Sequence, residues 1–208
     1  MCRQTGSHSG LTSGGATRLV VGADCDIREN VTMNTGTEDG GGITQVGDRC
    51  FFMVGSHVGH DCKIGSNVVF ANNTLLAGHV TVGDHVMFGG GVAVRQFVRI
   101  GEGAMIVGLS GLRADLIPWG MAQGPLADLI GLNVIGMRRR GIAKADIHRY
   151  REAFRELFFG GGEFRARLER IAGDHGQDTP VGKMIAFIRA GTRPLTMGSK
   201  RGEAEEIA

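Results

Sequence analysis

The sequence predicts a β-solenoid, a parallel β-helix of hexapeptide repeats, followed by a small α-helical carboxy-terminal domain. An apolar residue stands at every sixth position from Val46 to Leu112 without a break. Because 42% of the residues are hydrophobic, the chance of such a run in one register is roughly 10⁻⁵. A period of six fits neither the 3.6-residue helix nor simple strand alternation. It is typical of short strands that stack coil on coil.

The other hexad positions agree with this fold. The residue after each apolar one is mostly glycine or alanine, which suits tight corners. The fifth position is mostly small or β-branched, which suits the pleated wall of a narrow prism. Three hexads per coil would give a triangular section, with residues three hexads apart stacked about 4.8 Å from one another. The period by itself leaves the hand of the coil open.

The order of segments along the chain follows from breaks in this pattern. Residues 1–16 are polar and rich in glycine and serine, so we expect an irregular segment there. The β-helix is predicted over residues 17–117, with a weaker first coil at Val21, Ile27 and Met33. The glycine-rich segment 36–42 interrupts it, and we interpret this segment as a loop thrown out from one corner. Pro118, which has no N–H for a ladder, should end the repeat.

Beyond Pro118 the pattern becomes helical, and we assign residues 118–208 to a helical domain that caps the last coil. The first helix is predicted over residues 126–139, the second over 143–159 and the third over 163–172. Thr179 and Pro180 have the residue types of an N-cap and a first helical position for a last helix that ends at Ala190. The tail from Gly191 onward is polar and expected to fray. The apolar stripes of the second and third helices predict inward Ile147, Tyr150, Phe154, Leu157, Phe158, Phe164, Leu168 and Ile171.

Composition narrows the function classes. The formal net charge is +2, so no global field favours nucleic acid or a membrane surface. The start carries no apolar leader and no run reaches transmembrane length, so we expect a cytoplasmic protein without membrane insertion. Cys50 and Cys62 fall at inward positions and are interpreted as small buried thiols. Metal-binding spacing such as CxxC does not occur in the sequence.

The chemistry-bearing residues gather on one predicted corner. The stacking rule puts His60 in one column with Gly78 and Gln96, and puts Asp61 in the next column with His79. His60 and His79 should then be diagonal neighbours, with His57 close by. Such a histidine can take a proton from a hydroxyl or an amine, and a carboxylate can orient it. Gly78 offers a bare N–H to a developing oxyanion, although each histidine alone could be an exposed corner residue.

Two other interpretations stay open at this point. Three histidines on a β-helix can hold zinc, but the spacing of His57 and His60 does not resemble that of β-helical carbonic anhydrases, so we predict no metal. The run Arg138–Arg140 ends a predicted helix, where it could compensate the helix dipole. It could equally bind phosphate in bidentate geometry, with Asn133 on the same helix face.

These residues carry a resemblance that covers about residues 17–190. The sequence closely resembles the acyl-carrier-protein–UDP-N-acetylglucosamine O-acyltransferases, which begin lipid A synthesis. The resemblance implies a left-handed parallel β-helix, an exception to the usual crossover hand, and a homotrimer with active sites between subunits. The matching segments are SHVGHDCKIG (56–65), NNTLLAGHVTVGD (72–84), GGGVAVRQF (89–97), MAQG (121–124) and GLNVIGMRRRGI (131–142).

The resemblance also implies residue roles. His60 matches the general base for the sugar 3-hydroxyl, Asp61 supports it, and Gly78 matches the oxyanion donor. Acyl transfer from the phosphopantetheine thioester of acyl carrier protein needs a base, an oxyanion donor and positioning, so no metal or redox cofactor is expected. Gly108 falls where the family sets acyl length, and a small residue there should admit a longer chain. The remaining matches are His57 and His79 (substrate contacts), Gly90 and Gln96 (site lining), Asn133 and Arg139 (nucleotide), and Arg140 (near the phosphopantetheine).

Departures from the family pattern leave two further hypotheses. The family carries additional amino-terminal coils, and a substrate-contacting Gln-Asp-Leu-Lys-like stretch is replaced here by residues 8–11. Arg95 and Leu126 each replace a histidine, and Ile135 replaces an acidic residue near the nucleotide. We therefore consider a transferase for another nucleotide sugar or amino sugar. We also consider a shortened, poorly active trimer with a structural role, because solenoid stability is roughly a sum over coils.

Overall fold

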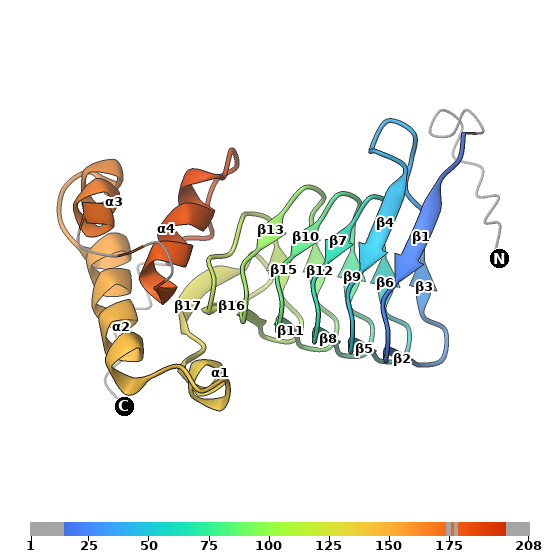
Figure 1. The fold of residues 1–208 in the computed structure, drawn as a ribbon, viewed down its shortest axis with the longest axis horizontal. Helices are drawn as coiled ribbons and strands as arrows, with labels where there is room; N and C mark the ends of the chain where they lie inside the picture. The colour runs from blue at the N-terminus through green and yellow to red at the C-terminus, as the bar shows by residue number, and fades with distance from the viewer. Residues whose placement is uncertain (1–14, 174–175, 177–178, 199–208) are drawn as a thin grey trace.

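The computed structural model of the chain describes residues 15–173, 176 and 179–198. Short strands stack along the long axis of the molecule, and the four helices gather at the end away from the first coil (Figure 1). Of the irregular segment predicted over residues 1–16, residues 1–14, including the stretch 8–11, lie outside the described residues. Among the described residues, every helix is too short or too polar to cross a membrane.

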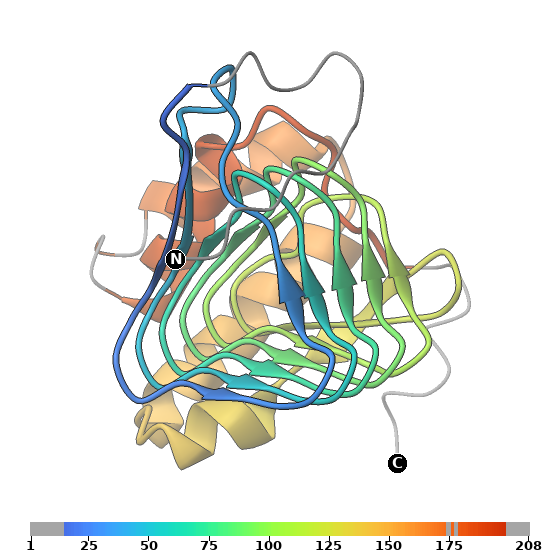
Figure 2. The ribbon, with the colours of Figure 1, turned by 90° about the vertical axis from the view of Figure 1, so that its right-hand side faces the viewer.

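The strands form three sheets, and the view along the axis shows the three-sided section (Figure 2). The first sheet contains β1 (Arg18–Val21), β4 (Ile43–Val46), β7 (Lys63–Ile64), β10 (Thr81–Val82) and β13 (Arg99–Ile100). The second contains β2 (Asp26–Ile27), β5 (Phe51–Phe52), β8 (Val69–Phe70), β11 (Met87–Phe88), β14 (Met105–Ile106), β16 (Gly120–Gln123) and β17 (Asp128–Leu132). The third contains β3 (Thr32–Met33), β6 (His57–Val58), β9 (Leu75–Leu76), β12 (Ala93–Val94) and β15 (Gly111–Leu112).

The register confirms the stacking rule. Lys63 lies beside Thr81, which is 18 residues further along the chain, and both belong to the first sheet. The first coil has a larger offset, because Val21 pairs with Val46. The difference comes from the segment 36–42, which adds residues between β3 and β4 and confirms the predicted interruption. All coils pair in parallel, as a solenoid requires.

The core is the column of inward hexad residues. Phe52, Phe70 and Phe88 are fully buried, and their ring centroids stack 4.5 and 4.8 Å apart. Burying each such ring contributes about 1.5–3 kcal/mol. Cys50 and Cys62 are buried as predicted, and burial raises the pKa of the Cys62 thiol to about 11. At neutral pH this thiol is protonated and acts as a small apolar group, which agrees with the prediction.

The region after the repeat differs from the prediction. Pro118 does not end the solenoid, because β16 adds to β14 and β17 pairs antiparallel to β16. The helix predicted over residues 126–139 is wrong for its first half. Leu129 is buried while its neighbour Ile130 is exposed, and this alternation is that of a strand that covers a sheet edge. Only α1 (Val134–Arg139) is helical there.

The remaining helices match the predicted ranges closely. They are α2 (Lys144–Phe159), α3 (Phe164–Gly173) and α4 (Pro180–Arg189). Thr179 is the N-cap of α4, since its hydroxyl accepts a hydrogen bond from the N–H of Gly182 at 3.0 Å. The predicted inward residues of α2 are buried except Phe158, which is partly buried. The buried hydroxyl of Tyr150 donates to the carbonyl of Pro118 and ties α2 to the solenoid.

The described part of the tail, residues 191–198, is not frayed. The N–H of Asp115 donates to the carbonyl of Pro194 at 2.9 Å, and the N–H of Thr196 donates to the carbonyl of Asp115 at 2.7 Å. The tail therefore satisfies backbone groups that the last coil would otherwise leave open. The buried Asp115 carboxylate also pairs with Arg99 at 2.7 Å, which anchors this edge from the inside.

Candidate active site

The predicted catalytic corner forms where the third sheet turns into the first. Asp61 and His79 occupy successive coils with φ values of 58° and 60°, a left-handed conformation in which Asp, Asn and His are enriched. The N–H of His79 donates to the carbonyl of His60 at 2.8 Å and locks the two corners together. The rings of His60 and His79 meet edge to face with centroids 4.9 Å apart, which confirms the predicted diagonal contact.

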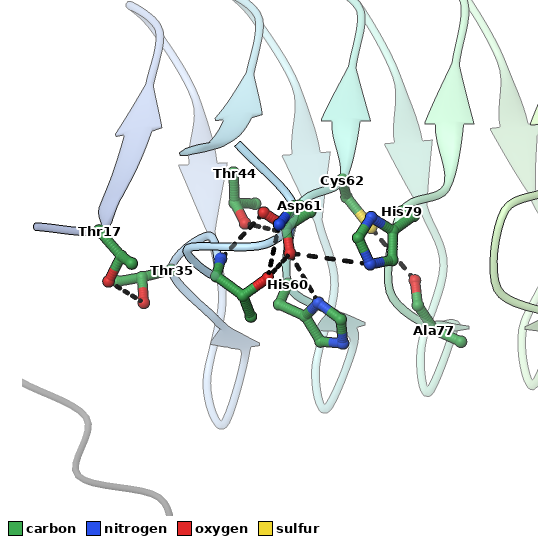
Figure 3. Close-up of polar contacts among 10 residues, drawn as sticks. Thr17, Thr35, Thr44, His60, Asp61, Cys62, Ala77 and His79 are labelled. Carbon is green, nitrogen blue, oxygen red and sulfur yellow. Dashed lines mark hydrogen bonds and ion pairs between the residues drawn. The ribbon is translucent and has the colours of Figure 1, made fainter. Parts of the chain in front are cut away.

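His60 and Asp61 form a hydrogen-bonded dyad. Nδ1 of His60 lies 2.8 Å from Oδ2 of Asp61, and Nε2 of His79 lies 3.9 Å from the same oxygen. The side chain of Asp61 is only 1% exposed, whereas that of His60 is 30% exposed. One residue of the dyad is thus sheltered and the other can be reached from outside. Figure 3 shows the contacts of the Asp61 carboxylate with His60 and His79.

Hydrogen bonds keep the buried carboxylate ionised. Burial alone would raise the pKa of Asp61, but hydrogen bonds from Thr37 and His60 outweigh it and lower this pKa below the ordinary value of 3.8. The N–H and hydroxyl of Thr37 lie 2.9 and 2.6 Å from the two carboxylate oxygens. The N–H of Asp61 donates to Oγ1 of Thr44 at 2.8 Å. An ionised Asp61 can orient His60 and stabilise its protonated form.

Gly78 lies against the imidazole of His60. A Cβ built at this position would come within 2.5 Å of both Cε1 and Nε2 of His60, so only glycine fits without a shift. Among the described residues, the Gly78 N–H has no hydrogen-bond acceptor. The predicted proximity of this donor to the candidate base is therefore present. Gln96 follows in the same column on the next coil and is exposed.

His57 stands apart from the His60–His79 pair. Its Nδ1 lies 2.8 Å from Oγ1 of Thr32 on the preceding coil, and burial lowers its pKa, which favours the neutral ring. The group of side chains whose ligand atoms lie within 4.8 Å of one another contains His60, Asp61 and His79, and His57 is outside it. The predicted cluster of three histidines is thus a His60–His79 pair, and His57 lies apart from it as a neutral ring.

Gly90 and Gly108 lie at a different corner, where the second sheet turns into the third. The carbonyl of Gly90 accepts the N–H of Leu109 at 2.8 Å, and a Cβ at Gly108 would lie 3.1 Å from that same oxygen. The two glycines therefore leave an open ledge on adjacent coils. Within one chain, the structure does not bring this ledge to the His60 corner.

The predicted nucleotide residues share a groove of about 410 Å³ over the second sheet. Asn133, Arg139 and Arg140 all line it. The amide of Asn133 is also structural, because Oδ1 caps α1 through the Gly136 N–H at 2.8 Å and Nδ2 donates to the carbonyl of Gly103 at 2.9 Å. The exposed Arg139 and Arg140 thus carry the positive charge of the groove.

Sequence reasoning missed two residues near these sites. His85 lines the nucleotide groove, and its buried Nδ1 has no hydrogen-bond partner among the described residues. Burial, and then the charge of Arg140, lower the pKa of His85. The signal was its place one hexad after His79 at a left-handed corner. Thr37 was missed because it lies in the interrupting segment 36–42, where the repeat predicts no position.

Comparison with known proteins identifies the family to which the chain belongs. Residues 115–196 match the family profile described as UDP-N-acetylglucosamine O-acyltransferase, domain 2, and residues 43–78 match that of the bacterial transferase hexapeptide. An acyl-[acyl-carrier-protein]–UDP-N-acetylglucosamine O-acyltransferase of Agrobacterium fabrum is 45% identical over 91% of this chain and 70% of its own length.

Solved structures with the same description superpose closely. UDP-N-acetylglucosamine O-acyltransferase from Moraxella catarrhalis aligns with a TM-score of 0.86 at 34% identity, over 91% of this chain and 74% of its own. The enzyme from Campylobacter jejuni aligns with a TM-score of 0.83 at 36% identity, over 89% and 73% of the two chains. The chain is an acyltransferase and belongs to the family of UDP-N-acetylglucosamine O-acyltransferases.

Proposed function

We propose that this protein transfers a 3-hydroxyacyl group from acyl carrier protein to the 3-hydroxyl of UDP-N-acetylglucosamine, the first step of lipid A biosynthesis. The observation that carries this proposal is the His60–Asp61 dyad over Gly78 in a chain 45% identical to an enzyme named for these substrates. The relatives and the superposed structures named above all act on UDP-N-acetylglucosamine by their descriptions. They do not favour another sugar acceptor or an inactive structural relative.

His60 acts as the general base in this proposal. Its Nδ1–H donates to Asp61, so Nε2 carries the lone pair that takes the proton of the sugar hydroxyl. The hydroxyl oxygen attacks the thioester carbonyl, a C–O bond forms and the C–S bond breaks. The imidazolium then returns its proton to the departing phosphopantetheine thiolate. Asp61 stabilises the imidazolium between these two proton transfers.

Gly78 supplies the oxyanion donor. Its N–H has no acceptor among the described residues and lies beside the base, where it would stabilise the tetrahedral intermediate. His79 lies beside this donor, and its ring stacks on that of Phe97 with centroids 4.4 Å apart. His57 and Gln96 contact the edges of the substrate. A base, a donor and positioning suffice for thioester aminolysis or alcoholysis, so the reaction draws on no cofactor beyond the carrier's thioester.

In this proposal the nucleotide and the carrier occupy two different grooves at the helical end. Asn133 and Arg139 hold the uridine diphosphate, and Arg140 lies towards the phosphopantetheine, where guanidinium geometry suits phosphate oxygens. A second groove of about 500 Å³ between α1 and α2 is lined by Arg138, Lys144, His148 and Arg151. This basic lining supports the docking of a negatively charged carrier.

The active unit is a homotrimer in this proposal. The His60 corner and the Gly90–Gly108 ledge lie at different corners of the prism, so only neighbouring copies can bring them to one substrate. Leu75, Met87 and Leu109 are large apolar side chains exposed on the solenoid wall, at 48, 41 and 81%. Leu75 lies on the third sheet, Met87 on the second and Leu109 at the corner between them, and we assign these side chains to the contact between copies. Gly108 would then set the acyl length by leaving room for a long chain.

We place the reaction in the cytoplasm. The free thiols of Cys25, Cys50 and Cys62 support a reducing compartment, as does the requirement for acyl carrier protein and a nucleotide sugar.

Mass spectrometry of the product tests the proposed function. The purified chain is incubated with 3-hydroxyacyl carrier proteins of several lengths and with a panel of UDP- and dTDP-linked sugars and amino sugars. The proposal predicts one product, acyl-UDP-N-acetylglucosamine. A product on another acceptor would establish the alternative transferase, and a folded trimer without any product would favour the structural relative. Light scattering of the same sample gives the oligomeric state.

A further inference from the structure

The segment 36–42, which leaves the corner between β3 and β4 (Figure 1), packs against the catalytic corner. A Cβ at Gly40 would lie 2.2 Å from the carboxylate carbon of Asp61, so the loop backbone packs directly on that side chain. Thr37 is only 9% exposed. The loop residues Thr37 and Gly40 therefore help to bury the Asp61 carboxylate.

The direction of each hydrogen bond in the loop can be assigned. The N–H of Gly40 donates to Oγ1 of Thr37 at 3.1 Å. The single hydroxyl proton of Thr37 is then free to point at Oδ2 of Asp61, 2.6 Å away. The N–H of Thr37 donates to Oδ1 of the same carboxylate at 2.9 Å. Both oxygens of Asp61 thus face donors, and an acceptor-only carboxylate fits this arrangement.

The Asp61 oxygen that accepts from the Thr37 hydroxyl, Oδ2, is also the oxygen that contacts His60. Because Asp61 offers only acceptors, the Nδ1 atom of His60 at 2.8 Å must carry a proton. The other ring nitrogen then keeps its lone pair, and it is Nε2 that lies over Gly78. The tautomer needed for a base is therefore fixed by a chain that runs from Gly40 through Thr37 and Asp61 to His60.

We propose that Thr37 is a positioning residue, which holds Asp61 so that His60 keeps its Nδ1–H tautomer and its catalytic orientation. The expected effect on kcat rests on the proposed function. The expected effect on the tautomer of His60 is independent of it. The titratable groups His60, His79 and the Cys62 thiol interact electrostatically with Asp61. Without the Thr37 hydroxyl, the carboxylate can turn towards Nε2 of His79, which is already within 3.9 Å.

The test compares Thr37→Val, which removes the hydroxyl at nearly constant volume, with Thr37→Ser, which keeps it. Thr35→Val is the matched control, because Oγ1 of Thr35 accepts from the Thr17 hydroxyl at 3.1 Å and has no bond to the dyad. Thr37→Val should lower kcat about 10- to 100-fold, as expected for loss of a hydrogen bond to a charged group. The KM for UDP-N-acetylglucosamine should change less than about twofold, and Thr37→Ser should restore most of kcat.

A second readout does not depend on turnover. In the protein with ¹⁵N-labelled histidine, NMR at a pH where the ring is neutral should show His60 as the Nδ1–H tautomer. Thr37→Val should convert part of it to Nε2–H, and Thr35→Val should not. If Thr37→Val does not fold, Thr37→Ala carries the same expectation with less bulk beside Asp61.

The outcomes separate this inference from the proposed function. An altered tautomer in a protein whose wild type lacks acyltransferase activity supports the positioning role and overturns the proposed function. An active wild type with full activity and an unchanged tautomer in Thr37→Val overturns the positioning role alone. Equal losses in Thr37→Val and Thr37→Ser would also overturn it, because a structural role would not distinguish the two.

Discussion

The imidazole of His60 rests on the bare Cα of Gly78. A Cβ at position 78 would lie 2.5 Å from Nε2 of His60, below the 3.0 Å that real Cβ contacts keep. The contact joins two successive coils and places the Gly78 N–H, which has no acceptor within the described part of the chain, close to the imidazole that takes the proton. It explains why the column of His60 has a glycine on the next coil.

Gly78→Ala tests this contact. The methyl group would push His60 aside and misalign both the base and the donor, so we expect kcat to fall at least about 100-fold. Gly161→Ala is the matched control, because a Cβ there meets nothing within 4 Å. Circular dichroism should show both variants folded. Activity of Gly78→Ala within a few-fold of the control would contradict the assigned contact.

Asp61→Asn tests the ionised carboxylate through stability. The pKa of Asp61 is lowered in the folded protein, so its ionisation contributes stability that is present above the ordinary value of 3.8 and is lost as the pH falls through the folded pKa. The thermal midpoint of the wild type should therefore approach that of Asp61→Asn as the pH drops from about 5 to about 2. A difference that does not depend on pH would contradict the pKa direction.

Gly108→Leu tests the ledge that we assign to the acyl chain. A side chain there would fill space beside the carbonyl of Gly90, which lies 3.1 Å from the Cβ position. Preference should move to shorter donors, with a loss of about 10- to 200-fold in kcat/KM for each methylene that no longer fits. A competition assay among acyl carrier proteins that carry chains of different length measures this preference. An unchanged length profile, equal to that of Gly161→Leu, would remove Gly108 from the acyl site.

The repeat allowed much of the catalytic corner to be predicted from the sequence. In a solenoid with constant coil length, neighbours in space follow from counting, so the His60–His79 contact and the His60–Gly78 contact could be derived before the structure. The same counting predicted Cys50 and Cys62 as buried thiols. Each of these predictions depends only on which residues stack above one another on successive coils, and the register of the parallel strands fixes that stacking.

Counting fails where the repeat is interrupted. Thr37 lies in the segment 36–42, which is outside the hexapeptide repeat. Its position is set by hydrogen bonds to the two carboxylate oxygens of Asp61. The sequence predicts helix for Asp128–Leu132 because its apolar residues fit both a helix and a strand. In the structure the segment is a strand, because it pairs with the open edge of β16. The tail was expected to fray because its partner, the backbone of Asp115, is distant in sequence.

Single-turnover acyl transfer by His60→Ala shows whether His60 is the general base. The wild type, His60→Ala and the exposed same-coil control Lys63→Ala are mixed with 3-hydroxyacyl carrier protein and UDP-N-acetylglucosamine. We expect a loss of about 10²- to 10⁴-fold in His60→Ala with the fold retained, full activity in Lys63→Ala, and partial recovery of His60→Ala with added imidazole. Transfer by a folded His60→Ala variant within a few-fold of the wild type would contradict it.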